Sequence, residues 1–75
     1  RSVTLTVTRD SEILLDRIPV TLETLTPTLR PLLVPAGTNV VVAADSSAPS
    51  GIVVQAMLKA REAGAEHFLF AVTPK

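Results

Sequence analysis

Cysteine, tryptophan and tyrosine are absent from this 75-residue sequence. Because there is no cysteine, disulfides, thiolate metal sites and cysteine nucleophiles are excluded. A surplus of one charge is also lacking, since seven Lys and Arg residues balance seven Asp and Glu residues. Phosphate backbones and anionic membrane surfaces both attract an excess of cations, so we expect no nucleic-acid partner and no polybasic membrane segment. The longest apolar runs, 40–44 and 68–72, are far shorter than the roughly 20 residues that span a bilayer.

The length and the hydrophobic content indicate one small folded domain, residues 1–75, with a core from 3 to 72. Hydrophobic residues make up 47% of the chain, which argues against disorder. A domain of this size buries only about 60% of its unfolded surface, so apolar surface is expected to remain for a partner or a second copy. The chain opens with Arg1 rather than methionine, and we expect a fragment of a longer protein that carried any membrane helix or targeting segment.

The first part of the sequence predicts a β-hairpin. Residues 3–8 alternate valine or leucine with threonine, the period of a strand with one buried face. Residues 12–15 are predicted to form a second strand, which pairs with the first across a polar turn at 9–11. Residues 18–20 then lead extended into the next element, because a residue before proline avoids helical geometry.

A helix is predicted after Thr21, whose hydroxyl suits the N-cap position and is followed by leucines at helical spacing. Pro27 and Pro31 interrupt this pattern, because a proline costs about 3 kcal/mol inside a helix. We therefore expect a bent or broken helix that still packs its leucines inward.

The second half predicts a strand, a helix and a strand. Residues 40–44 are apolar throughout, the pattern of a strand covered on both faces. A helix is expected from Ser50, a plausible N-cap, to Gly64 in a left-handed C-terminal position, and residues 67–72 form the last strand. The inward face of this helix is predicted to contain Ile52, Val53, Ala56, Met57, Ala60 and Ala63. The order strand, strand, helix, strand, helix, strand predicts a two-layer α/β (α+β) domain with two helices packed on a small mixed sheet.

Residues suited to catalysis are few. A hydrolase built on Ser50 and His67 is permitted by residue type, but no nucleophile-elbow sequence accompanies the serine. His67 is instead expected to be a partly exposed strand residue. The carboxylates are scattered without metal-ligand spacing. We therefore expect no enzyme activity, no catalytic residue, no cofactor and no metal.

A stand-alone binding module is a further alternative. Free backbone donors at the start of the second helix, with Ser46, Ser47 and Ser50 nearby, could hold an anion or a cell-wall fragment across residues 45–51. The segment lacks a glycine-rich loop, however, and Asp45 repels anions. These features favour a capped helix with a hydroxyl-rich turn.

The aromatic and threonine-rich segments have both structural and binding interpretations. Phe68 and Phe70 share one strand face and are expected in the core rather than on a base-stacking platform. The threonine face of residues 3–8 is expected to be the solvated side of a sheet, or else an edge open to strand addition by another chain.

Together these segments resemble the periplasmic domain of the ExbD/TolR family, over nearly the whole chain from Val3 to Thr73. The similarity is carried by residues 3–10, 12–15, 19–25, 40–45 with Pro49, 53–57, 61–64 and the apolar last strand. The chain departs from the family pattern at several positions. Ser50 stands where tyrosine is usual, Ala48 where valine is common and Ser11 where a turn glycine is frequent, and Pro27 and Pro31 interrupt a helix that is usually continuous.

The resemblance implies a subunit of a proton-driven inner-membrane complex of the ExbB-ExbD-TonB or TolQ-TolR-TolA type, which couples proton flow to transport or envelope work. In that family the proton-carrying aspartate lies in a transmembrane helix, so Asp10, Asp16 and Asp45 are not assigned its role. The implied partners are a second copy, an ExbB/TolQ-like membrane subunit, a TonB/TolA-like protein and peptidoglycan. The implied location is the bacterial inner membrane, single-pass, with this domain in the periplasm. The partner-binding candidates are Asp45, Pro49, Ser50, Thr4, Thr6 and His67.

Overall fold

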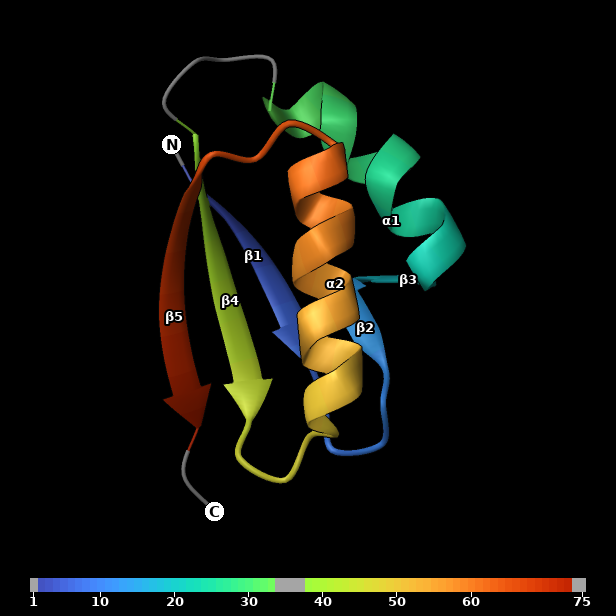
Figure 1. The fold of residues 1–75 in the computed structure, drawn as a ribbon, viewed down its shortest axis with the longest axis vertical. Helices are drawn as coiled ribbons and strands as arrows, with labels where there is room; N and C mark the ends of the chain where they lie inside the picture. Colours follow the sequence, from blue (N-terminus) through green and yellow to red (C-terminus); the bar gives the residue numbers. More distant parts are fainter. Residues whose placement is uncertain (1, 34–37, 74–75) are drawn as a thin grey trace.

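The computed structural model describes residues 2–33 and 38–73. Within these residues the chain forms a five-stranded mixed sheet, in the order β3-β2-β1-β4-β5, with α1 and α2 on one face (Figure 1). The predicted fold class, two helices on a small mixed sheet, is confirmed. The elements are β1 (Ser2–Val7), β2 (Ile13–Leu15), β3 (Ile18–Val20), α1 (Leu22–Leu29), a 3-10 turn (Arg30–Leu33), β4 (Asn39–Asp45), α2 (Ser50–Glu62) and β5 (His67–Thr73).

Strand β1 lies at the centre of the sheet. It pairs antiparallel with β2 and parallel with β4, so that Leu5 lies opposite both Leu15 and Val42. The valines and leucine of β1 are buried under the helices, whereas Thr4 and Thr6 lie half-buried on the open face of the sheet. The predicted alternation is therefore confirmed. The alternative that this strand is a free edge is wrong, because both of its sides are paired.

Strand β4 differs from its prediction as a fully covered strand. Val40 and Val42 are buried against the helices, but Val41 and Ala43 are only half-buried. The reason is architectural: among the described residues both helices lie on the same face, so the other face of β4 has no second layer. An unbroken apolar run does not by itself distinguish one covered face from two.

Strand β3 is the element missing from the sequence prediction. Residues 18–20, expected only as an extended lead to the helix, pair antiparallel with β2 and place Pro19 opposite Leu14. The turn that folds them back has two left-handed residues, Asp16 at φ 50° and Arg17 at φ 74°. Two positive φ angles are the hallmark of a tight hairpin turn that normally carries Asn-Gly or Asp-Gly. Because Arg17 occupies the glycine position, the sequence gives no such signal.

Helix α1 begins and ends as its sequence requires. Thr21 is the N-cap: its hydroxyl accepts the backbone N–H of Thr24 at 3.2 Å, and the Thr24 hydroxyl accepts that of Thr21 at 2.9 Å. The helix contains Pro27 and gives way after Leu29 to the 3-10 turn. Leu25 and Leu29 are buried, so the predicted broken helix with inward leucines is confirmed.

Helix α2 packs through its alanines. Ala56 and Ala60 are fully buried, and the rest of the predicted inward face is buried or half-buried. Gly64 follows at φ 113°, as expected after a helix end. The predicted N-cap is wrong, however. Pro49 holds the N-cap position without a side-chain capping bond, and Ser50 is the first residue of the helix.

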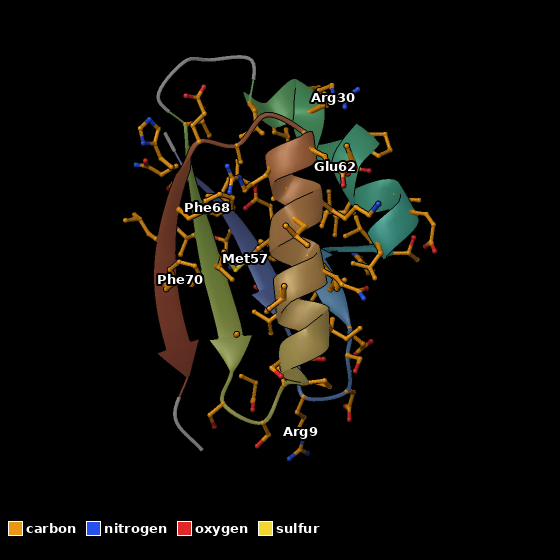
Figure 2. All side chains as sticks on the ribbon, in the orientation of Figure 1. Arg9, Arg30, Met57, Glu62, Phe68 and Phe70 are labelled. Atoms are coloured by element: carbon orange, nitrogen blue, oxygen red, sulfur yellow. The ribbon has the colours of Figure 1, made fainter. Side chains whose placement is uncertain are left out.

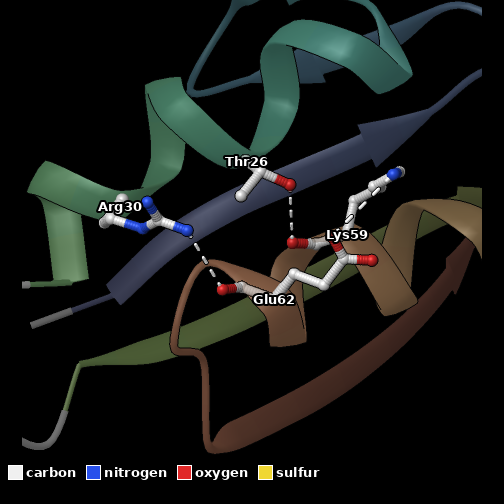
Figure 3. A network of polar contacts seen from close by, with 4 residues as sticks. All are labelled: Thr26, Arg30, Lys59 and Glu62. Atoms are coloured by element: carbon white, nitrogen blue, oxygen red, sulfur yellow. Dashed lines mark hydrogen bonds and ion pairs between the residues drawn. The ribbon is translucent and has the colours of Figure 1, made fainter.

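Two side chains of the α1 region clamp the end of α2 (Figure 3). The Thr26 hydroxyl donates to the backbone oxygen of Lys59 at 3.0 Å, and the Arg30 guanidinium donates to that of Glu62 at 3.4 Å. The Lys59 oxygen also accepts the N–H of Ala63, so the Thr26 hydroxyl is a second donor there, and the two side-chain bonds tie the α1 region to the end of α2. Neither helix in the described residues is long and apolar enough to cross a membrane.

Candidate docking surface

The residues predicted to bind partners are divided among separate parts of the fold. Thr4 and Thr6 lie on the open face of the sheet. Three of the predicted residues, the loop group, lie where β4 ends and α2 begins, and His67 begins β5 at the opposite end of the strands. The loop group contains Asp45, Pro49 and Ser50. The structure therefore brings the loop residues together but does not bring all the candidates into one site.

Thr4 and Thr6 line an open hollow of about 360 Å³ together with Asp16 and Arg17. Asp16 binds β1 directly: its carboxylate accepts the N–H of Thr4 at 2.9 Å, and its own N–H donates to the Thr4 oxygen at 2.9 Å. These bonds continue the β1 ladder beyond β2 and hold the β2–β3 turn on the sheet. The hydrogen bonds between Thr4 and Asp16 therefore have a structural role in the sheet.

Asp45 organises the loop between β4 and α2. Its carboxylate accepts the N–H of Ser47 at 2.7 Å, and its backbone oxygen accepts the N–H of Ala48 at 2.9 Å. An anion at this junction would compete with the carboxylate for the Ser47 donor and would also be repelled by its charge. The geometry thus gives the anion-binding alternative no support. It agrees with a polar turn at residues 45–48, but the predicted cap is wrong, since no side chain caps α2.

Ser50 and His67 lie too far apart for a catalytic pair. Ser50 is the first residue of α2 and His67 follows its other end, and the 13 residues of this helix at 1.5 Å rise span about 20 Å. A serine and its general base must approach within about 3 Å. His67 is an exposed residue at the start of β5, as expected. In residues 2–33 and 38–73 no group of His, Asp and Glu residues is placed to hold a metal ion.

The outer edge of β5 is a further candidate surface, and of the predicted residues only His67 lies on this strand. This strand pairs with β4 on one side and is the last strand of the sheet (Figure 1). Leu69 is 54% exposed and Phe70 62% exposed, on opposite faces of the strand. Phe68 is half-buried against the core, but the prediction that Phe70 lies in the core is wrong. Phe70 points to the helix side of the sheet, yet β5 lies beside α2 rather than beneath it.

A hollow of about 410 Å³ adjoins this edge between α2 and β5. Met57 and Phe68 supply its apolar wall, and Arg61 and Glu66 supply opposite charges. Figure 2 shows Met57 on α2 and both phenylalanines on the neighbouring strand. The sequence signal for this surface is the apolar run 68–72, in which Phe68 and Phe70 are expected in the core because they share one strand face. The β5 edge and this hollow form an apolar surface of the kind that marks protein contacts.

One comparison with known proteins gives a result across the whole chain. The family model described as "Biopolymer transport protein ExbD/TolR" matches residues 1–75. No curated protein is a match for the chain.

Proposed function

Because this chain belongs to the ExbD/TolR family of biopolymer transport proteins, we propose that it is the docking domain of an energy-transducing membrane complex. In this proposal the complex is of the ExbB-ExbD-TonB or TolQ-TolR-TolA type and uses the proton-motive force. The domain lies in the periplasm and is joined to the bacterial inner membrane by a single helix encoded upstream of Arg1. It transmits work through contacts and catalyses no reaction.

The observation that carries the proposal is the family match over residues 1–75, and the β5 edge agrees with it. A domain that passes force to other proteins needs surface that its own fold leaves uncovered. Leu69 and Phe70 provide such surface on a strand with one free side. Large exposed apolar side chains grouped on one edge are more typical of an interaction surface than of a monomer's solvent face.

The proposed partners are a second copy of the chain, an ExbB/TolQ-like membrane subunit, a TonB/TolA-like protein and peptidoglycan. Pairing of two copies suits a small domain, since association buries apolar surface that one copy leaves exposed. The chain's zero formal charge is compatible with protein contacts that rest on shape and apolar area.

Two measurements test the proposal. The native gene is sequenced upstream of the codon for Arg1, and the full-length protein is purified from native membranes in mild detergent. We expect one apolar helix of spanning length that contains an aspartate, and co-purification of an ExbB/TolQ-like subunit identified by mass spectrometry. A start codon or cleavable signal peptide directly before Arg1, with no such subunit recovered, would contradict the proposal.

A further inference from the structure

We infer that a hollow beside the β1–β2 turn binds an arginine side chain of a partner protein. Glu12 supplies the counter-charge, the Ser11 hydroxyl accepts a further hydrogen bond, and an apolar floor receives the aliphatic stem of the arginine. The site lies apart from the β5 edge and does not include the exposed Ile18. The inference therefore goes beyond the proposed function and does not depend on it.

The shape of the hollow supplies the first argument. It has a volume of about 310 Å³ and lies where the β1–β2 turn passes beside the first turn of α2 (Figure 1). Its floor is buried or half-buried and apolar, and it is built from β2, β3, α1 and α2 by the side chains of Ile13, Val20, Leu22 and Ile52. Its rim is exposed and consists of Ser11, Glu12, Pro19 and Thr21. The hollow thus offers apolar contact below and polar groups at its mouth.

The charge of the hollow supplies the second argument. Glu12 is the charged residue that lines it, and within the described residues its carboxylate forms no ion pair and no hydrogen bond. The backbone of Glu12 is held twice by Thr8: its N–H donates to the Thr8 hydroxyl at 3.1 Å, and its oxygen accepts the Thr8 N–H at 2.9 Å. A carboxylate fixed above an apolar floor selects a cation on an apolar stem, which describes arginine and lysine. Arginine suits the site better, because its planar fork binds a carboxylate through two N–H groups.

Ser11 supplies a third, independent argument. Its φ of 66° lies in the left-handed region, which is unfavourable for a residue with a Cβ. Its hydroxyl lines the hollow and forms no hydrogen bond within the described residues. Residues held in such backbone conformations gather at ligand contacts. The turn therefore holds a hydroxyl beside the Glu12 carboxylate, where it accepts a guanidinium N–H that the carboxylate leaves over.

The open rim indicates that the occupant is a protein side chain rather than a free small molecule. Pockets for small molecules cover roughly 70–90% of the surface of their ligand. Here four of the lining residues are exposed, so the hollow covers its occupant from one side only. A side chain on a partner's backbone needs no such enclosure, because neighbouring residues of the partner cover the rim.

Amide chemical-shift mapping by NMR on the isotope-labelled 75-residue chain tests the inference. The probe is a capped pentapeptide, acetyl-Gly-Leu-Arg-Leu-Gly-amide, and the matched probes carry glutamine or glutamate in place of the arginine. We expect the arginine peptide to bind in the millimolar range, with shift changes concentrated at residues 11–13, 20–22 and 52. The glutamine peptide should bind about fivefold more weakly, the effect of losing one exposed ion pair. The glutamate peptide should not bind.

Two variants test the roles of the polar residues. Glu12→Lys should reverse the preference, so that the glutamate peptide binds and the arginine peptide does not. Ser11→Gly should weaken binding of the arginine peptide about threefold, because the hydroxyl acceptor is lost. The same change relieves the left-handed backbone and should make the chain more stable. A purely structural role of Ser11 would not let a stabilising change weaken binding.

Glu66→Gln is the matched control, because Glu66 is an exposed carboxylate that lines the other hollow, between α2 and β5. It should leave binding unchanged, and thermal melts establish that each variant remains folded. No binding, shift changes centred on residues 66–70, equal binding of the arginine and glutamine peptides, or equal loss with Glu66→Gln overturns the inference. So does a dimer in sedimentation that Glu12→Lys dissociates, because a second copy then fills the hollow. None of these results alters the co-purification that tests the proposed function.

Discussion

The turn between β1 and β2 should be stabilised by glycine at one residue and destabilised by glycine at its neighbour. Ser11 has φ 66°, in the left-handed region, and its side chain makes no hydrogen bond within the described residues. The left-handed conformation costs a residue with a Cβ roughly 1–2 kcal/mol. Glycine avoids this cost but loses about 0.5–1 kcal/mol through extra freedom in the unfolded chain. The difference predicts that Ser11→Gly raises the free energy of unfolding by about 0.5–1 kcal/mol.

The assay is urea denaturation followed by far-ultraviolet circular dichroism, with a thermal melt alongside. In a domain of this size 1 kcal/mol moves Tm by about 4–8 °C, so Ser11→Gly should raise it by about 2–8 °C. Asp10→Gly is the matched control, because Asp10 is exposed in the same turn and is not among the residues with positive φ. It should lower stability by about 0.5–1 kcal/mol. Equal changes in both variants would refute the argument that backbone strain at Ser11 is the cause.

Three further predictions concern the helices. Leu25→Ala should cost about 2–5 kcal/mol by denaturation, because Leu25 is fully buried, whereas Leu58→Ala, at a side chain 54% exposed, should cost under about 1 kcal/mol. Thr26→Val should lower stability by about 1 kcal/mol, since the hydrogen bond between α1 and the Lys59 oxygen is lost while that oxygen keeps the N–H of Ala63; an unchanged midpoint would count against that clamp. Hydrogen bonds from its own backbone N–H and from the Thr21 hydroxyl lower the pKa of Glu23. Its ionised form therefore adds stability above its usual pKa that disappears as pH falls through the lowered value, so Glu23→Gln should destabilise at pH 7 and converge with the parent in acid.

The elements with regular periodicity could be predicted from the sequence. The alternation in β1 and the alanine face of α2 each need only one buried side, and local spacing records that directly. The broken α1 followed from two prolines at known positions. Strand β3 could not be predicted, because Asp16 and Arg17 adopt left-handed geometry that their residue types do not announce.

The docking surface was less accessible to sequence reasoning. Exposure of Phe70 depends on where α2 lies across the sheet, and no local pattern in residues 67–73 records that distance. The role of Asp45 in holding the Ser47 donor could be found only from the loop geometry. The partner-binding candidates are mostly polar, whereas Leu69 and Phe70, the large exposed side chains of β5, are apolar.

Photo-crosslinking in living cells tests the central claim, that the domain docks partners through β5. A photoreactive phenylalanine analogue replaces Phe70 in the full-length protein, and in a second strain it replaces Ile18, which is exposed at the opposite edge. Irradiation should link the Phe70 position to a partner protein that mass spectrometry identifies as TonB- or TolA-like, with little adduct from the Ile18 position. Adducts of equal yield from both positions, or adducts from Ile18 alone, would contradict the account.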